Sequence, residues 1–280
     1  MGRRTDQSIL LVSLALLQSG CIQLDSRASE NMAMGARDSA TIAADDSIFP
    51  ASAREIEAAV NNPSRRKSDR GQDDQRRAEA VLAFFGINRG MTVLDLYSGG
   101  GYYTEILSYL VGDAGRVVAH NNKPYLSYAK DELAGRYDEN RLPNVEQLIA
   151  ENNELELAPQ SFDAVLMIKA YHDLYYVDED AGWTKVDIPK FLAEIYAALK
   201  PGGVLGIVDH NAVAGSPGST GGTLHRIDPA LIKRDVTAAG FTYAGESSVL
   251  RNPEDDLTQT VFADALRDKT DRSVIRFWKP

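Results

Sequence analysis

The chain has 280 residues, enough to bury one substantial core, and its 44% hydrophobic and 25% charged residues are ordinary for a globular protein. The formal net charge of −10 argues against a nucleic-acid-binding surface, which is normally basic. The single cysteine, Cys21, excludes an internal disulfide and a cysteine-based zinc site.

The first 21 residues have the features of an export signal. Two arginines near the start precede an apolar run over residues 9–17, which is too short to span a bilayer. Small residues then lead into Cys21, so residues 1–21 resemble a bacterial lipoprotein signal that leaves this cysteine lipidated at the mature N-terminus. Because Gln18 departs from that pattern, cleavage by another peptidase stays open, as does a cytoplasmic protein with a frayed N-terminal helix.

Residues 22–47 are small and polar, and we interpret them as a flexible tether. Together with the signal, they predict an exported, periplasmic protein whose only membrane contact is a lipid at Cys21. If the signal assignment is wrong, the protein is cytoplasmic.

Residues 48–90 are predicted to form an N-terminal helical cap. Apolar residues recur at helical spacing in 52–62 and 73–86. The basic link 63–70 between them is interpreted as a solvated loop, with part of a lid over a ligand pocket as the alternative.

From residue 91 to 280, strand and helix patterns alternate, which predicts one α/β domain with a seven-stranded, mostly parallel sheet and helices on both faces. The strands are expected at 91–97, 116–121, 144–150, 162–169, 203–209, 241–250 and 273–279. Helices are expected at about 102–111, 188–199 and 228–239, and in an insertion at 254–268.

The first strand leads into a glycine loop and then a helix. The residues Asp95-x-x-x-Gly99-x-Gly101 resemble motif I of the class I S-adenosylmethionine-dependent methyltransferases. Tyr97 stands where that family has its first glycine, so the first turn of the loop must differ. A nicotinamide-binding Rossmann enzyme fits less well, because its glycines follow the strand at a different spacing.

The resemblance implies a Rossmann-like methyltransferase fold and S-adenosylmethionine as cofactor. In the family an acid that ends the second strand holds the ribose, and Asn121 stands there; an acid after the third strand meets the adenine, and Glu151 stands there. The tyrosines of the loop could face the sulfonium or pack. The implied cofactor-binding residues are Asp95, Tyr97, Gly99, Gly101, Tyr103, Asn121, Glu151 and Asn152.

All four histidines fall at or after predicted strand ends, where ligands of such sheets bind. A histidine could deprotonate an acceptor near neutral pH. We therefore expect catalytic roles for His172, His210 and His225, with Asp209 or Asp173 as an orienting group. The alternatives are that His172 lines the cofactor pocket and that His210 is inert at a strand end.

The same residues were considered as metal ligands, but their spacings match no compact ligand motif, so no metal is predicted. The glycine-rich segment 215–222 is expected to be a mobile active-site loop, or else a surface linker. Arg226, which follows it, is a candidate to bind an acidic group of the acceptor.

These observations predict a methyltransferase that acts on a small or envelope-associated acceptor. S-adenosylmethionine is made in the cytoplasm, which conflicts with an export signal. A non-catalytic exported ligand-binding module that retains the fold is therefore the alternative. The sequence indicates neither the acceptor nor the oligomeric state.

Overall fold

A computed structural model describes residues 51–280. The predicted signal (1–21) and tether (22–47) lie outside the described residues. Within the described part of the chain, none of the helices is both long and apolar enough to cross a membrane.

The structure contains a seven-stranded sheet, as predicted, with the order β3-β2-β1-β4-β5-β7-β6. Neighbouring strands are parallel except that β7 runs antiparallel to both β5 and β6. The strand order reverses between β1 and β4, and ligands of such sheets bind beyond the carboxyl ends at this point. The strands are β1 Thr92–Leu96, β2 Arg116–Asn121, β3 Val145–Ile149, β4 Phe162–Ile168, β5 Leu199–His210, β6 Thr242–Ser247 and β7 Arg272–Trp278.

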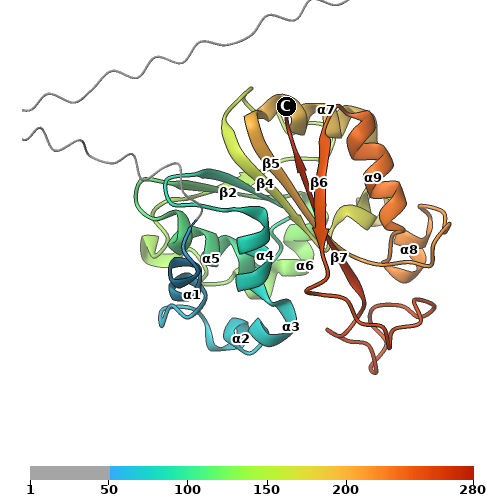
Figure 1. The fold of residues 1–280 in the computed structure, drawn as a ribbon, viewed down its shortest axis with the longest axis horizontal. Helices are drawn as coiled ribbons and strands as arrows, with labels where there is room; N and C mark the ends of the chain where they lie inside the picture. Colours follow the sequence, from blue (N-terminus) through green and yellow to red (C-terminus); the bar gives the residue numbers. More distant parts are fainter. Residues whose placement is uncertain (1–50) are drawn as a thin grey trace, which may run out of the picture. The chain divides into compact units, whose positions relative to one another are not determined.

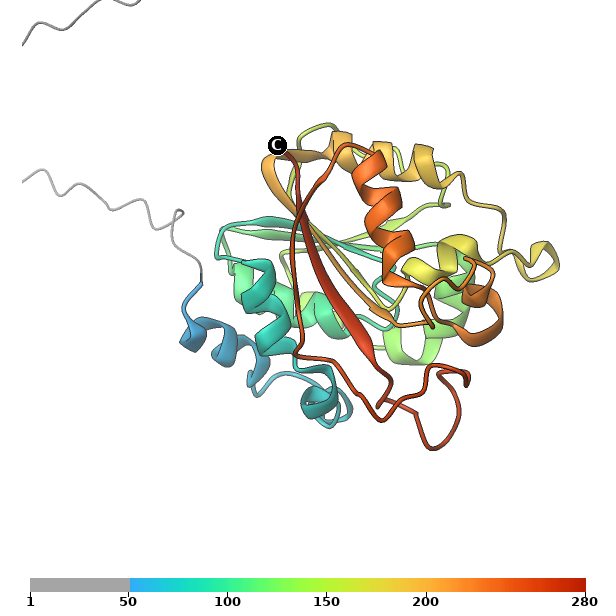
Figure 2. The ribbon, with the colours of Figure 1, turned by 45° about the vertical axis from the view of Figure 1, so that its right-hand side comes forward.

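Helices cover both faces of the sheet, with α1, α4 and α5 on one side and α7 and α9 on the other (Figures 1 and 2). The α-helices are α1 Ala53–Val60, α2 Lys67–Arg70, α3 Asp73–Arg76, α4 Ala78–Phe85, α5 Tyr102–Val111, α6 Lys123–Leu133, α7 Ile188–Ala198, α8 Thr220–Leu224 and α9 Pro229–Ala238. Short 3₁₀ turns are η2 Asp138–Asn140, η3 Tyr171–Tyr175 and η4 Glu179–Ala181.

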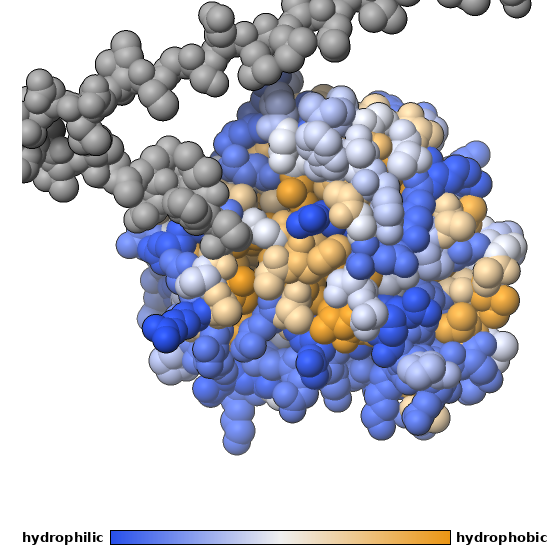
Figure 3. Space-filling model, in the orientation of Figure 1, coloured by the Kyte–Doolittle hydropathy of each residue, from blue (hydrophilic) through white to orange (hydrophobic). Residues whose placement is uncertain are grey.

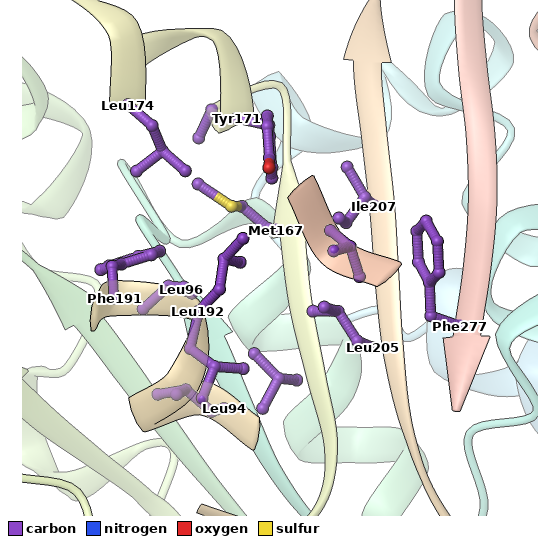
Figure 4. Packing of buried hydrophobic residues seen from close by; sticks show 14 of the residues in the cluster. Leu94, Leu96, Met167, Tyr171, Leu174, Phe191, Leu192, Leu205, Ile207 and Phe277 are labelled. Carbon is purple, nitrogen blue, oxygen red and sulfur yellow. The ribbon is translucent and has the colours of Figure 1, made fainter. Parts of the chain in front are cut away.

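Side chains alternate between two cores, as the pleat of a strand requires. Leu94 and Leu96 of β1 belong to the core beneath α7 and α9, whereas Val93 belongs to the core beneath α4 and α5. Figure 4 shows the first core, where Met167 of β4 lies among leucines of β1 and α7. On the face drawn in Figure 3, apolar residues gather near the middle, over α4 and the sheet edge beside it.

The N-terminal segment differs from the prediction in two ways. The helix expected over 73–86 is broken into α3 and α4 at Arg77, whose φ of 47° is left-handed. The link 63–70 is only in part a solvated loop: most of its residues are exposed, but Arg65 is buried in an ion pair with Asp73, and α2 forms within the link. The cap is packed against the domain through α1 and α4, which share a core with α5.

The segment between β6 and β7 also differs from the prediction, because it forms turns and no α-helix. It loops below the sheet at the end where α8 lies (Figure 1). Its Asp255 makes a buried, two-bonded ion pair with Arg226, at 2.9 and 3.0 Å. Arg226 is fully enclosed, so the expectation that it binds an acceptor is wrong: its charge is already neutralised inside the protein.

Candidate active site

A pocket of about 290 Å³ lies at the carboxyl end of the sheet, beside the switch between β1 and β4. Its wall combines the glycine loop, α6, the residues after β4, and the segment that precedes β7. Of the predicted site residues, the pocket is lined by Tyr97, Gly99, His172, His210 and His225. The strand-end rule thus located the pocket correctly.

The glycine loop takes the left-handed turns that motif I demands, with φ of 54° at Gly99 and 82° at Gly101. Tyr97 also has a positive φ, 57°, at the position where the family has glycine. Its ring is buried against Tyr125 and Phe191, with centroid distances of 5.0 and 6.1 Å. The Tyr97 hydroxyl is buried and has no hydrogen-bond partner among the described residues.

Asn121 does not face the pocket. Its Oδ1 accepts a hydrogen bond from the Gly99 amide at 2.9 Å, and its Nδ2 donates to Ser98 Oγ and to the Gly99 carbonyl at 3.0 and 3.1 Å. Both amide protons are therefore used to hold the glycine loop. Asn121 thus helps to fix the shape of the loop, and its expected contact with a ribose stays a prediction.

The remaining predicted cofactor residues are not among those that line the pocket: Asp95, Gly101, Tyr103, Glu151 and Asn152. The Asp95 carboxylate accepts a hydrogen bond from Thr104 Oγ1 at 2.6 Å, and burial raises its pKa to about 6. Asn152 Oδ1 accepts a hydrogen bond from Asn122 Nδ2 at 3.0 Å. A direct contact of these residues with the cofactor stays a prediction.

The predicted catalytic residues come together. Nδ1 of His172 lies 2.8 Å from Oδ1 of Asp209, and the His172 amide donates to the other oxygen of the same carboxylate, also at 2.8 Å. Nε2 of His172 lies 3.4 Å from Oδ1 of Asp173, and Nδ1 of His225 lies 4.0 Å from that same oxygen. The His210 ring is 6.1 Å from the His172 ring, centroid to centroid.

The three imidazoles have different charge preferences. Burial alone would lower the pKa of His172, but the carboxylates of Asp209 and Asp173 outweigh it and raise that pKa to about 9. Burial lowers the pKa of His225, with the nearby His172 adding to the effect. Burial and the Lys169 charge hold the pKa of His210 well below its usual value.

Glycine has a different role in segment 215–222 from the one predicted. A Cβ on Gly221 would lie 2.3 Å from the His172 carbonyl oxygen, so only glycine lets α8 approach η3 this closely. His225 ends α8 in a left-handed conformation, φ 53°, and donates its amide to the Gly221 carbonyl. The end of the segment is thus packed on η3 and carries His225 to His172, whereas Gly215, Pro217 and Ser219 are exposed. The mobility expected of the loop stays a prediction.

The pocket residues that are not among the sequence-based candidates include Arg76, Tyr125, Val261 and Phe262. Lys169, which also lines the pocket, follows β4 and is one of the candidates that the strand-end rule indicates. Burial and the charges of Arg76 and Arg272 lower the pKa of Lys169 to about 7. Arg76 comes from α3 in the cap, and no local pattern in the sequence indicates that this segment reaches the pocket.

Comparison with known proteins gives consistent matches. A family model described as a methyltransferase domain matches residues 87–247. The ubiquinone/menaquinone biosynthesis C-methyltransferase UbiE of Escherichia coli O1:K1 / APEC is 30% identical over 187 residues, which are 64% of this chain and 67% of that protein.

Two solved structures share the fold. A SAM-dependent methyltransferase from Aquifex aeolicus has a TM-score of 0.52 at 23% identity, covering 81% of this chain and 99% of that one. An S-adenosylmethionine-dependent methyltransferase from Mesorhizobium loti has a TM-score of 0.51 at 16% identity, covering 75% of this chain and all (100%) of that one.

Proposed function

Because the chain belongs to the methyltransferase-domain family, we propose that it transfers a methyl group to a small acceptor bound at the histidine end of the pocket. The cofactor that the family indicates is S-adenosylmethionine. The observation that carries the proposal is that one pocket is lined both by the glycine loop and by three histidines.

The residues at the loop end fit the cofactor. A Cβ on Gly99 would meet nothing within 4 Å, so the backbone is open to a ligand there. The pocket also holds the guanidinium of Arg76 and the ammonium of Lys169, which suit the carboxylate of the methionine part. The departure is at Asn121, whose amide is already used by the loop.

When bound, S-adenosylmethionine supplies a methyl group on a positively charged sulfur. The chain's own contribution is to position the acceptor in line with that methyl group and to exclude water. His172 is held by Asp209 and faces the pocket, while His210 and His225 border the same space. All three rings can orient an acceptor. His210 and His225, whose lowered pKa values keep them neutral, can take its proton where the acceptor must lose one, whereas the raised pKa of His172 keeps that ring charged.

Support for a class of acceptor comes from the similarity to the UbiE relative. That relative is named as a C-methyltransferase of ubiquinone and menaquinone biosynthesis, which makes phenolic compounds the first acceptors to test. The apolar side chains of Val261 and Phe262 in the pocket wall suit an aromatic ring.

A non-catalytic ligand-binding module remains the second candidate. It is favoured at two positions where this chain differs from the family pattern. Tyr97, at the first glycine of motif I, has a buried ring, and Asn121, at the ribose-binding acid, is hydrogen-bonded to the glycine loop. The two functions differ in turnover, because a binding module takes up the cofactor and releases it unchanged.

Calorimetric titration of the full-length chain with S-adenosylmethionine and S-adenosylhomocysteine tests the proposal. We expect micromolar binding that Gly99→Val abolishes. The matched control is Gly202→Val, since Gly202 also has a positive φ (77°) with open space around it but lies in the turn of β5, far from the pocket. Absence of heat with either ligand, or equal losses in both variants, would contradict the proposed function.

We also propose that the protein is exported and anchored through Cys21. The support is the sequence of residues 1–21 alone. Fractionation of the bacterial envelope checks it: the wild-type chain should stay with membranes, and Cys21→Ser should appear in the soluble periplasmic fraction or keep its uncleaved signal.

A further inference from the structure

We propose that His172, Asp173 and His225 bind one divalent transition-metal ion at the acceptor end of the pocket. The proposal goes beyond the methyltransferase function, and metal binding itself does not depend on that function.

The three side chains are arranged as a nearly closed ligand set. One ligand atom from each lies within 4.8 Å of the other two. The carboxylate Oδ1 of Asp173 is the common neighbour, at 3.4 Å from the His172 ring and 4.0 Å from the His225 ring. Zinc bonds to histidine and carboxylate are about 2.0–2.2 Å long, which puts ligand atoms of a tetrahedral site roughly 3.3 Å apart. Side-chain shifts of less than about 1 Å would therefore close the site.

Two of the three ligands, His172 and Asp173, are each oriented by a hydrogen bond with a further side chain, as is usual in protein metal sites. The Asp209 carboxylate accepts from Nδ1 of His172, which leaves Nε2 directed at Asp173. The Tyr125 hydroxyl donates to Oδ2 of Asp173 at 2.5 Å, which leaves Oδ1 for the metal.

The ligand chemistry selects the class of ion. Two imidazoles and one carboxylate suit Zn²⁺ and its transition-metal neighbours, whereas Mg²⁺ and Ca²⁺ prefer oxygen ligands alone. Three protein ligands leave at least one coordination position open, which is typical of catalytic rather than structural sites. The open coordination position faces the pocket, because all three ligand residues line the pocket.

The competing explanation is a plain ion pair, with a charged His172 between Asp173 and Asp209. It accounts for His172 but gives His225 no role. Among the described residues no group hydrogen-bonds to the His225 ring, although the chain adopts a left-handed conformation (φ 53°) to place that ring 4.0 Å from the carboxylate. A metal ion explains why two imidazoles point at one carboxylate oxygen.

The consequence for catalysis rests on the proposed function. An acceptor oxygen, nitrogen or sulfur atom bound at the open position would be polarised and would lose its proton more readily. The glycine loop and the metal ligands then serve the two reactants from opposite ends of one pocket.

The test is calorimetric titration of tag-free, chelator-treated protein with Zn²⁺, with Mg²⁺ as the comparison ion. The full chain is used with Cys21→Ser, which removes its one thiol as a competing ligand. We expect one Zn²⁺ per chain and no Mg²⁺ binding. His225→Asn and Asp173→Asn should each weaken Zn²⁺ binding at least about tenfold, since each removes a ligand.

Asp180→Asn is the matched control, because Asp180 is an exposed carboxylate on nearby η4. It should leave Zn²⁺ affinity unchanged. Circular dichroism of each variant checks that it is folded, and His225, only partly buried, is the safer of the two ligand positions. His210→Asn tests the ligand set: a loss as large as that of His225→Asn would overturn it.

Absence of Zn²⁺ binding, or affinity equal in wild type and both ligand variants, would also overturn the proposal. S-adenosylmethionine is titrated separately into metal-free protein. Cofactor binding without Zn²⁺ binding would refute the metal site and leave the proposed function standing. Zn²⁺ binding without cofactor binding would refute only the proposed function.

Discussion

The Asp209 carboxylate binds His172 twice, through the ring nitrogen Nδ1 and the backbone amide, both at 2.8 Å. These two bonds join the end of β5 to η3, 37 residues apart in the chain. They fix both the place of His172 and the direction of its ring. The predictions below start from this pair.

Asp209→Asn should reduce methyl transfer by about 10- to 100-fold, because the ring of His172 loses its orienting acceptor. The dissociation constant of S-adenosylmethionine should stay unchanged, since Asp209 does not line the pocket. Kinetics at saturating cofactor, together with calorimetry, separate the two effects. Loss of cofactor binding with kcat intact would show that the role of Asp209 has been misassigned.

Gly221→Ala should push α8 away from η3, because its Cβ would lie 2.3 Å from the His172 carbonyl. The overpacking should lower the free energy of unfolding by about 1–3 kcal/mol. Urea denaturation measures the change, and Ser219→Ala, at an exposed position before α8, is the control. Equal stability of Gly221→Ala and Ser219→Ala would argue against tight docking of α8.

Arg76→Gln and Lys169→Met should each weaken S-adenosylmethionine binding about tenfold or more, which is the effect of losing one charge-assisted hydrogen bond. Both side chains line the pocket. Arg70→Gln, which removes an exposed charge from α2, is the matched control. A cofactor affinity that falls equally in all three variants would indicate a general charge effect.

His120 should make the fold sensitive to acid. Its ring is buried and neutral, with Nδ1 facing the Tyr97 amide at 3.4 Å and Nε2 facing the Ala150 carbonyl at 3.0 Å. Burial lowers its pKa from 6.5 to about 4. The unfolded chain therefore binds a proton first, and stability falls as pH drops from about 6.5 to 4, by about 3 kcal/mol from this residue.

Asp95 has the opposite effect on folding stability as pH falls. Its pKa is raised from 3.8 to about 6 in the folded chain, so the folded chain binds the proton first and is stabilised relative to the unfolded chain. The His120 contribution is therefore measured as a difference, by urea denaturation of wild type and His120→Gln across this pH range. The difference in unfolding free energy should shrink or reverse towards pH 4. A difference independent of pH would contradict the assigned pKa of His120.

The fold was predictable because its signals are local. Buried strands followed by turns and helices mark β1, β2, β4 and β5, and Gly99 and Gly101 mark the loop that needs left-handed angles. The strand-end rule placed His172, Asp209 and His210 at one edge of the sheet.

The details of the site depend on contacts that no local pattern carries. Asn121 bonds to the glycine loop, and Arg226 meets Asp255 from a segment 29 residues away. The approach of His225 to Asp173 requires α8 to pack on η3 through Gly221. In the sequence, Gly221 is one of several glycines in a segment whose composition predicts a flexible loop. These side-chain partners follow from tertiary packing alone.

The central claim is that the cofactor's methyl group points at the histidine cluster. Nuclear Overhauser measurements on the protein bound to S-adenosylmethionine with a ¹³C-labelled methyl group test it directly, since the chain has only four histidines. We predict contacts from that methyl group to ring protons of the pocket histidines and none to His120, which lies behind the loop. A bound cofactor whose methyl group contacts none of the pocket histidines would contradict the account.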